Sequence, residues 1–109
     1  MQETDSSLWQ GAGEIDTMKF NAWSTKRILE GKKSLTSRTK RYDTDEDVTH
    51  IFGPLPLWFI VQYLYRDEGA DSPTELKRVI NQIFRQDVDW RREFYVHVLD
   101  VTKIQERLA

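Results

Sequence analysis

The chain contains no cysteine and only two histidines, His50 and His97. The absence of cysteine excludes disulfide bonds and thiolate metal sites, and it is typical of proteins in a reducing compartment. Two histidines alone do not form a metal site, so we expect neither a metal nor a cofactor. No hydrophobic run approaches the ~18 residues that a membrane-spanning helix needs, and the N-terminus lacks the apolar core of a signal peptide. We therefore expect a cytoplasmic protein that does not bind membranes.

What the chain does contain is charge: 31% of its 109 residues are charged, with a net charge of −2. A nearly balanced chain is not drawn strongly to nucleic acid as a whole, so any site for an anion must be a local basic patch. The length suits a single domain, which commonly runs to about 100–150 residues. Residues 1–16 are polar and acidic, with Leu8 and Trp9 as their large apolar side chains. We expect them to form a flexible tail before a monomeric domain over 17–109.

The sequence of the first half of the domain predicts short helices and strands. Alternation of apolar and polar residues predicts a strand over 17–23. Ser24 is a suitable N-cap for a helix over 25–30 that ends at Gly31. An extended segment over 34–42 and a strand over 48–52 follow, on either side of an acidic loop.

The second half gives the strongest pattern of the chain. An apolar run predicts a buried helix over 57–69. Ser72, Pro73 and Glu75 form a capping box for the next helix, whose apolar residues recur at helical spacing up to Phe84. Large side chains on both faces predict a strand over 93–101 that can be central, and a short helical turn can follow. The sequence thus predicts an α+β fold with a small mixed sheet or partly closed barrel.

The stretch GKKSLTSR, residues 31–38, raises the question of function. Because strand side chains alternate, Ser34, Thr36 and Arg38 share one face. One interpretation is a solvated basic segment that balances the acidic run at 43–47. The other is a turn and strand that hold an anionic or nucleotide-like ligand.

Three blocks together resemble the ASCH domain, a member of the PUA-like superfamily. These are ILEGKKSLTSR (28–38), YLYRDEGADSPTELKRVINQIF (63–84) and EFYVHVLDV (93–101), which occur in the order that the family shows. The resemblance implies a small mixed or antiparallel PUA-like β-barrel with two to three short helices. Between Arg38 and Gly53 the chain lacks the glycine-aspartate turn and longer strand that are usual in the family, so we expect a shorter barrel and a more open pocket.

The resemblance also implies function, because PUA-like domains are associated with RNA. A bacterial branch of ASCH proteins acts on N4-acetylcytidine as an amidohydrolase that uses a lysine, a threonine and a glutamate. By motif these fall on Lys33, Thr36 and, across a one-residue gap, Glu68. Arg38 matches the arginine of the family.

Such chemistry sets conditions on the site. Thr36 would be the nucleophile, and Lys33 could take its proton only with a pKa lowered by about three units through burial or neighbouring positive charge. Lys32 and Arg38 could supply that charge, whereas Glu68 would favour the charged amine. Lys33 must also lie in the turn after the helix, because positions 33 and 36 of a regular strand face opposite ways.

Three functions remain open. The first is binding of RNA or a modified nucleotide, with Lys32, Lys33 and Arg38 holding phosphate, Ser34 in the same cleft and Trp23 stacking on a base. The second is the amidohydrolase, and the third is a protein interaction domain that uses the tail. For the aromatic residues of the expected helix and for the two histidines we expect structural roles: His97 half-buried in its strand, His50 exposed, and Trp58, Phe59, Tyr63 and Tyr65 in the core.

Overall fold

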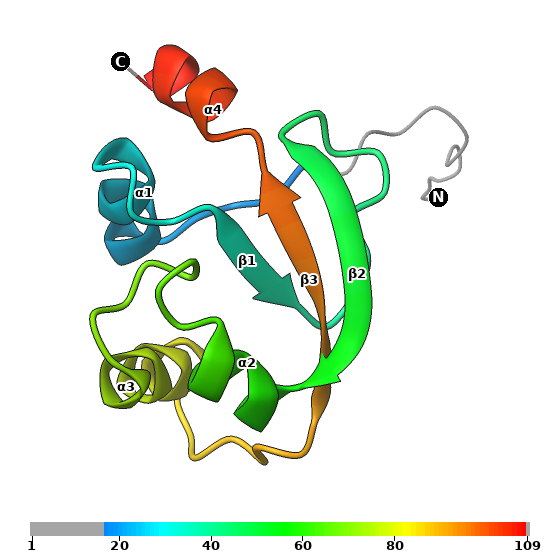
Figure 1. Ribbon diagram of the computed structural model, residues 1–109, viewed down its shortest axis with the longest axis vertical. Helices are drawn as coiled ribbons and strands as arrows, with labels where there is room; N and C mark the ends of the chain where they lie inside the picture. The colour runs from blue at the N-terminus through cyan, green and yellow to red at the C-terminus, as the bar shows by residue number, and fades with distance from the viewer. Residues whose placement is uncertain (1–16, 109) are drawn as a thin grey trace, which may run out of the picture.

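The computed structural model describes residues 17–108 (Figure 1). The expected tail over 1–16, with Leu8 and Trp9, lies outside the described residues. The described part is α+β, as predicted. Its elements are α1 (Ala22–Leu29), β1 (Leu35–Arg38), β2 (Val48–Pro56), α2 (Leu57–Tyr63), α3 (Pro73–Phe84), β3 (Glu93–Leu99) and α4 (Val101–Leu108).

The three strands described in 17–108 form one open antiparallel sheet in the order β1-β3-β2. β3 is central, which agrees with the large side chains on both of its faces. β1 is an edge strand, and its Thr36 pairs with His97 of β3. A closed barrel stays a prediction, whereas the open sheet leaves one edge of β1 free to border a cleft.

Helix α3 begins as the sequence predicts. The side chain of Ser72 accepts a hydrogen bond from the backbone N–H of Glu75 at 3.0 Å, and Pro73 is the first helical residue. The carboxylate of Glu75 reaches back to the N–H of Asp71 at 2.6 Å. The apolar face of α3 is buried through Leu76 and Val79, so local capping and helical periodicity agree with the tertiary packing here.

The predicted strand over 17–23 is wrong. α1 begins at Ala22, because the side chain of Asn21 accepts a hydrogen bond from the N–H of Ser24 at 2.8 Å and acts as the N-cap. Ser24, the predicted cap, lies buried inside the helix. Met18 is also buried, and its N–H donates to the buried carboxylate of Asp45 at 2.7 Å rather than to a neighbouring strand.

Strand β2 is longer than predicted. It continues through the GPLP segment to Pro56, beyond the predicted end of the strand at residue 52. β2 tolerates two prolines because it is an edge strand, where a missing N–H faces solvent, and because its pairing with β3 shifts between Phe52 and Leu55. The peptide bond between Gly53 and Pro54 is cis.

Helix α2 is shorter than predicted and ends at Tyr63, after which residues 65–69 form turns. Trp58 and Tyr63 are 49% and 64% exposed, so their predicted core positions are wrong. A two-turn helix buries one stripe, and Leu57, Ile60 and Val61 fill it. The early end of α2 frees the following residues to turn back toward β1.

The buried core of residues 17–108 has two parts. One lies around α2, α3 and β3, and the other joins α1 to α4 (Figure 1). The buried residues of the part that joins α1 to α4 are Met18, Ile28, Leu99 and Ile104.

None of the helices described in 17–108 has the length and apolar character that a membrane-spanning helix needs.

Candidate functional site

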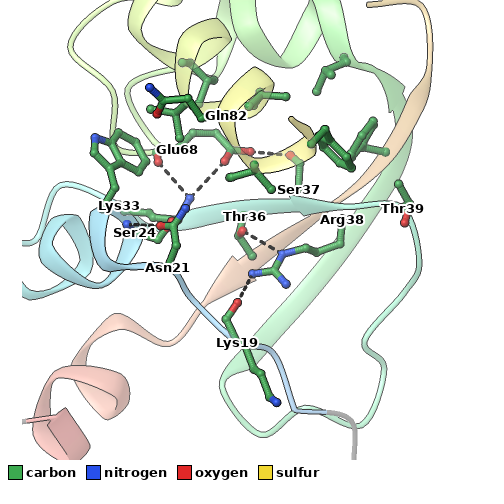
Figure 2. Close-up of a pocket in the computed structure, with 18 of the residues that line it drawn as sticks. Lys19, Asn21, Ser24, Lys33, Thr36, Ser37, Arg38, Thr39, Glu68 and Gln82 are labelled. Carbon is green, nitrogen blue, oxygen red and sulfur yellow. Dashed lines mark hydrogen bonds and ion pairs between the residues drawn. The ribbon is translucent and has the colours of Figure 1, made fainter. Parts of the chain in front are cut away.

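A cleft of about 630 Å³ lies between β1 and α3, with the segment before α1 as a further wall. Its two main walls differ in chemistry. The α3 wall is largely apolar and includes Val79, Ile83 and Phe84, whereas β1 contributes hydroxyl groups and the guanidinium of Arg38. Figure 2 shows the polar side chains of this cleft.

The deepest polar feature is an ion pair between Lys33 and Glu68. The ammonium of Lys33 donates to Oε1 of Glu68 at 3.2 Å and to the backbone carbonyl of the same residue at 3.0 Å. Their side chains are only 3% and 6% exposed. These two predicted site residues therefore meet inside the protein, although 35 positions separate them.

Two turns bring this pair together. After α1, the N–H groups of Lys32 and Lys33 both bond to the carbonyl of Arg27, at 2.8 and 3.2 Å. The next two N–H groups, at 34 and 35, bond to the carbonyl of Asp67 at 2.8 and 2.9 Å. The turn that carries Lys33 is thus tied by backbone hydrogen bonds to the turn that carries Glu68, as the geometric condition on Lys33 required.

Gly69 allows the two turns to approach. Its φ of +101° lies in the region that favours glycine, and an added Cβ would lie 3.0 Å from the Cβ of Lys33 and 3.1 Å from that of Arg27. No larger residue fits there without displacing Lys33. Gly69, the last residue of the predicted helix over 57–69, is therefore a contact point of the site.

Burial lowers the pKa of Lys33, because removing the ammonium from water disfavours its charged form. The charge and hydrogen bond of Glu68 oppose this effect, and the positive charge of Arg38 adds to it. The direction is the one that a proton-transferring lysine needs. Its leading cause is burial and not the neighbouring Lys32, whose side chain is 54% exposed and lies 3.9 Å from Glu30.

Ser37 is a further residue of the site, which the sequence pattern alone does not indicate. Its hydroxyl donates to Oε2 of Glu68 at 2.5 Å, so both oxygens of this carboxylate are engaged. Figure 2 shows Ser37 pointing from β1 toward Glu68. Strand alternation could have identified it as the hydroxyl facing away from Thr36, but only the position of Glu68 shows which face matters.

Thr36 and Arg38 lie on the other face of β1, as the alternation predicted. Nε of Arg38 lies 3.4 Å from the hydroxyl of Thr36, and its terminal nitrogen donates to the carbonyl of Lys19 at 2.9 Å. The guanidinium also lies 5.8 Å from the ring centroid of Tyr42. Both Thr36 and Arg38 border the cleft, which extends around the free edge of β1.

The remaining predicted site residues differ in whether they line the cleft. Trp23 lines the cleft, but cations already lie near its ring: Arg27 at 5.3 Å and Lys33 at 5.9 Å from the centroid. Lys32 and Ser34 do not line the cleft. The carbonyl and N–H of Ser34 hold the sheet and the turn, bonding to Leu99 and Asp67.

His97 is fully buried rather than half-buried. Its Nε2 accepts a hydrogen bond from the N–H of Tyr42 at 3.0 Å, and its Nδ1 lies 3.1 Å from the carbonyl of Tyr95. These partners assign the neutral tautomer with the proton on Nδ1. Burial lowers the pKa of His97, and the charges of Arg38 and Arg41 add to this. The ring therefore holds the loop at Tyr42 and is not a base facing the cleft.

Positive charge predominates along the cleft. Among its described lining residues Glu68 is the one carboxylate, and it is already paired with Lys33. In the part of the chain that the structure describes, no group of three or more His, Asp or Glu side chains could hold a metal ion. The cationic lining residues are Lys19, Lys33, Arg38, Lys40 and Arg85.

Comparison with protein-family models finds no match, and comparisons with curated proteins and with solved structures find none either.

Proposed function

We propose that the chain is an ASCH domain that binds RNA or a modified nucleotide in this cleft. The observation that carries the proposal is the charge of the cleft: among residues 17–108, five cationic side chains and one carboxylate line a single hollow that also has an apolar wall. Phosphate attracts the cations, and a base needs a flat apolar surface on which to stack. A cleft with both features suits a nucleotide better than a purely acidic or purely apolar ligand.

The geometry indicates which cations would meet phosphate. The ammonium of Lys33 is engaged by Glu68, and Lys32 lies outside the cleft. Arg38 lines the cleft with its guanidinium partly free, since its contacts in residues 17–108 are a hydroxyl, a carbonyl and aromatic rings. We therefore assign phosphate binding to Arg38 and Lys19, with the base against Ile83 and Phe84 of α3.

The proposal extends to the fold and setting. We infer that the sheet is a shortened form of the PUA-like barrel and that the protein is a cytoplasmic monomer. The order of elements supports it: a helix, a glycine-lysine turn and an edge strand are followed by a capped amphipathic helix and a final central strand. The third hypothesis, an interaction domain, depends on the tail, which lies outside the described residues.

Fluorescence anisotropy with a labelled single-stranded RNA tests this function. We expect affinity to fall steeply between 50 and 200 mM salt, since phosphate contacts release counterions. Arg38→Ala should weaken binding at least about tenfold, equivalent to one charge-assisted contact of about 1.4 kcal/mol. Lys32→Ala, which removes a neighbouring charge outside the cleft, is the matched control. Equal losses in both variants would contradict a defined cleft site.

One observation favours a second function, the amidohydrolase. A buried ammonium–carboxylate pair costs several kcal/mol of desolvation per ion before pairing repays it, so such pairs in a cleft often serve chemistry. Lys33 and Glu68 form such a pair, and both line the cleft. Hydrolysis of N4-acetylcytidine by the purified protein, lost in Lys33→Ala, would support it. No turnover across a panel of N-acylated nucleosides would reject it.

A further inference from the structure

We propose that Ser37 is the hydroxyl that this site activates for acyl transfer. Glu68 is the proton acceptor, and Lys33 both orients Glu68 and protonates the leaving group. The proposal rests on the hydrolase form of the proposed function. It differs from the expectation that the resemblance carries, in which the hydroxyl belongs to Thr36. The ligand class is an N-acyl or ester substrate whose acyl carbon can reach the Ser37 side of β1.

The arrangement at Glu68 carries this inference. An activated nucleophile lies within hydrogen-bond reach of a base, and a third group orients that base. The hydroxyl of Ser37 donates to Oε2 of Glu68 at 2.5 Å, and the ammonium of Lys33 donates to Oε1 at 3.2 Å. The two charged side chains are 6% and 3% exposed, whereas Ser37 is partly exposed and lines the cleft.

Thr36 lacks this arrangement. In the described part of the chain its hydroxyl contacts Nε of Arg38 at 3.4 Å, and it points to the face of β1 opposite Glu68 (Figure 2). A guanidinium is always a donor and takes no proton at neutral pH. The hydroxyl of Thr36 therefore has no base among its partners, whereas the hydroxyl of Ser37 has one.

The acyl-transfer step balances with these groups. Oγ of Ser37 bonds to the acyl carbon while its proton passes to Glu68. The leaving nitrogen takes a proton from Lys33 as the carbon–nitrogen bond breaks, which the lowered proton affinity of a buried amine permits. Glu68 then returns its proton to Lys33, and the ion pair is restored.

Water completes the cycle. It attacks the Ser37 ester and gives one proton to Glu68. The carbon–oxygen bond to Ser37 breaks, Oγ takes the proton back, and the carboxylic acid leaves. Arg38 contributes positive charge on the same cleft, and the apolar α3 wall at Ile83 can hold the acyl group.

The test uses the full chain and p-nitrophenyl acetate, an activated ester that needs no nucleoside recognition. Stopped-flow absorbance measures the burst of p-nitrophenolate, and peptide mass mapping locates the acetyl group. We expect a burst and acetylation at Ser37. Ser37→Ala should abolish both, Glu68→Gln should slow the burst at least about 100-fold, and Thr36→Val should retain it. Circular dichroism melts establish that each variant is folded.

Several results would overturn the proposal. These are acetylation at Thr36 or Lys33, absence of a burst, or a Ser37 acetyl level that is the same in Glu68→Gln as in the parent. The RNA anisotropy assay separates this failure from failure of the binding function. RNA binding without a burst would support the binding function and reject Ser37 as the nucleophile. A burst that depends on Ser37, without RNA binding, would support the nucleophile and reject the binding function.

Discussion

The Lys33–Glu68 pair of the cleft and the ion pairs between α4 and the loop before β2 each join a cation to a carboxylate, but in different surroundings. The cleft side chains are 3% and 6% exposed. Nearer the surface, Arg107 and Asp47 are 53% and 14% exposed in their pair, and Lys103 and Glu46 are 43% and 69% exposed. The charged groups of exposed pairs stay hydrated, and salt screens their attraction. The charges of the buried pair have lost their hydration, so each is stabilised mainly by the other.

This difference explains why sequence position is a poor guide to importance. Lys32 and Lys33 are adjacent and chemically identical, yet of the two only the ammonium of Lys33 is removed from water in the folded protein. The largest effects of substitution should therefore fall in the cleft, and they should decrease as the altered group becomes more exposed or less charged.

The largest loss is expected for Lys33→Met. This variant keeps an apolar side chain but leaves the carboxylate of Glu68 buried without its cation, so the free energy of unfolding should fall by about 3–5 kcal/mol. Urea denaturation followed by circular dichroism measures it. Lys32→Met, the matched control, should change stability by less than about 0.5 kcal/mol. Similarly small losses of stability in both variants would show that burial does not distinguish Lys33 from Lys32.

A smaller loss is expected for Gly69→Ala. The added Cβ would approach Lys33 and Arg27 to about 3 Å at a φ of +101°, so the backbone and the pair must shift. We expect a loss of about 1–3 kcal/mol in the free energy of unfolding, together with weaker function in the cleft. Gly31→Ala has a φ of +75°, but its Cβ would make only an ordinary van der Waals contact, with Nε2 of Gln105 at 4.0 Å. It therefore controls for backbone strain alone, and equal losses would argue against the close contact.

His97 extends the comparison to a buried group that stays neutral. Its pKa in the folded state lies below the ordinary value near 6.5, so the unfolded chain binds more protons between the two pKa values. Its contribution to stability is complete above pH ~6.5 and is lost as pH falls toward the folded-state pKa, at about 1.4 kcal/mol per unit of difference.

Urea titrations of the parent and of His97→Gln between pH 7 and 5 test this. The parent should lose more stability over this range than the variant does. His50→Gln, which alters an exposed histidine, should keep the pH dependence of the parent. A parent whose stability is unchanged down to pH 5 would contradict the burial argument.

The smallest effect is expected at the surface. Arg107 donates to Asp47 and lowers the pKa of that carboxyl, yet Arg107→Ala should cost only about 0–1 kcal/mol, and less at high salt. Thermal melts at low and high salt measure this. A loss as large as that of Lys33→Met would show that exposure does not decide the strength of these pairs.

Local pattern predicted some parts of the molecule well. The capping box at Ser72 and the apolar spacing of α3 depend on neighbours within one or two turns, so they could be recognised directly. The start of α1 could not, since Asn21 and Ser24 are both good caps and the buried contacts of Met18 favour the first. The exposure of Trp58 and Tyr63 depends on where α2 ends, which the apolar run does not indicate.

By itself, the sequence determined the α3 helix, the central strand β3 and the shared face of Thr36 and Arg38, because helical and strand periodicity act over a few residues. Only the tertiary structure decided that Lys33 and Ser37 meet Glu68, across 35 and 31 positions. Those contacts depend on two turns that pack at Gly69, and such packing is a property of the whole fold and not of either segment.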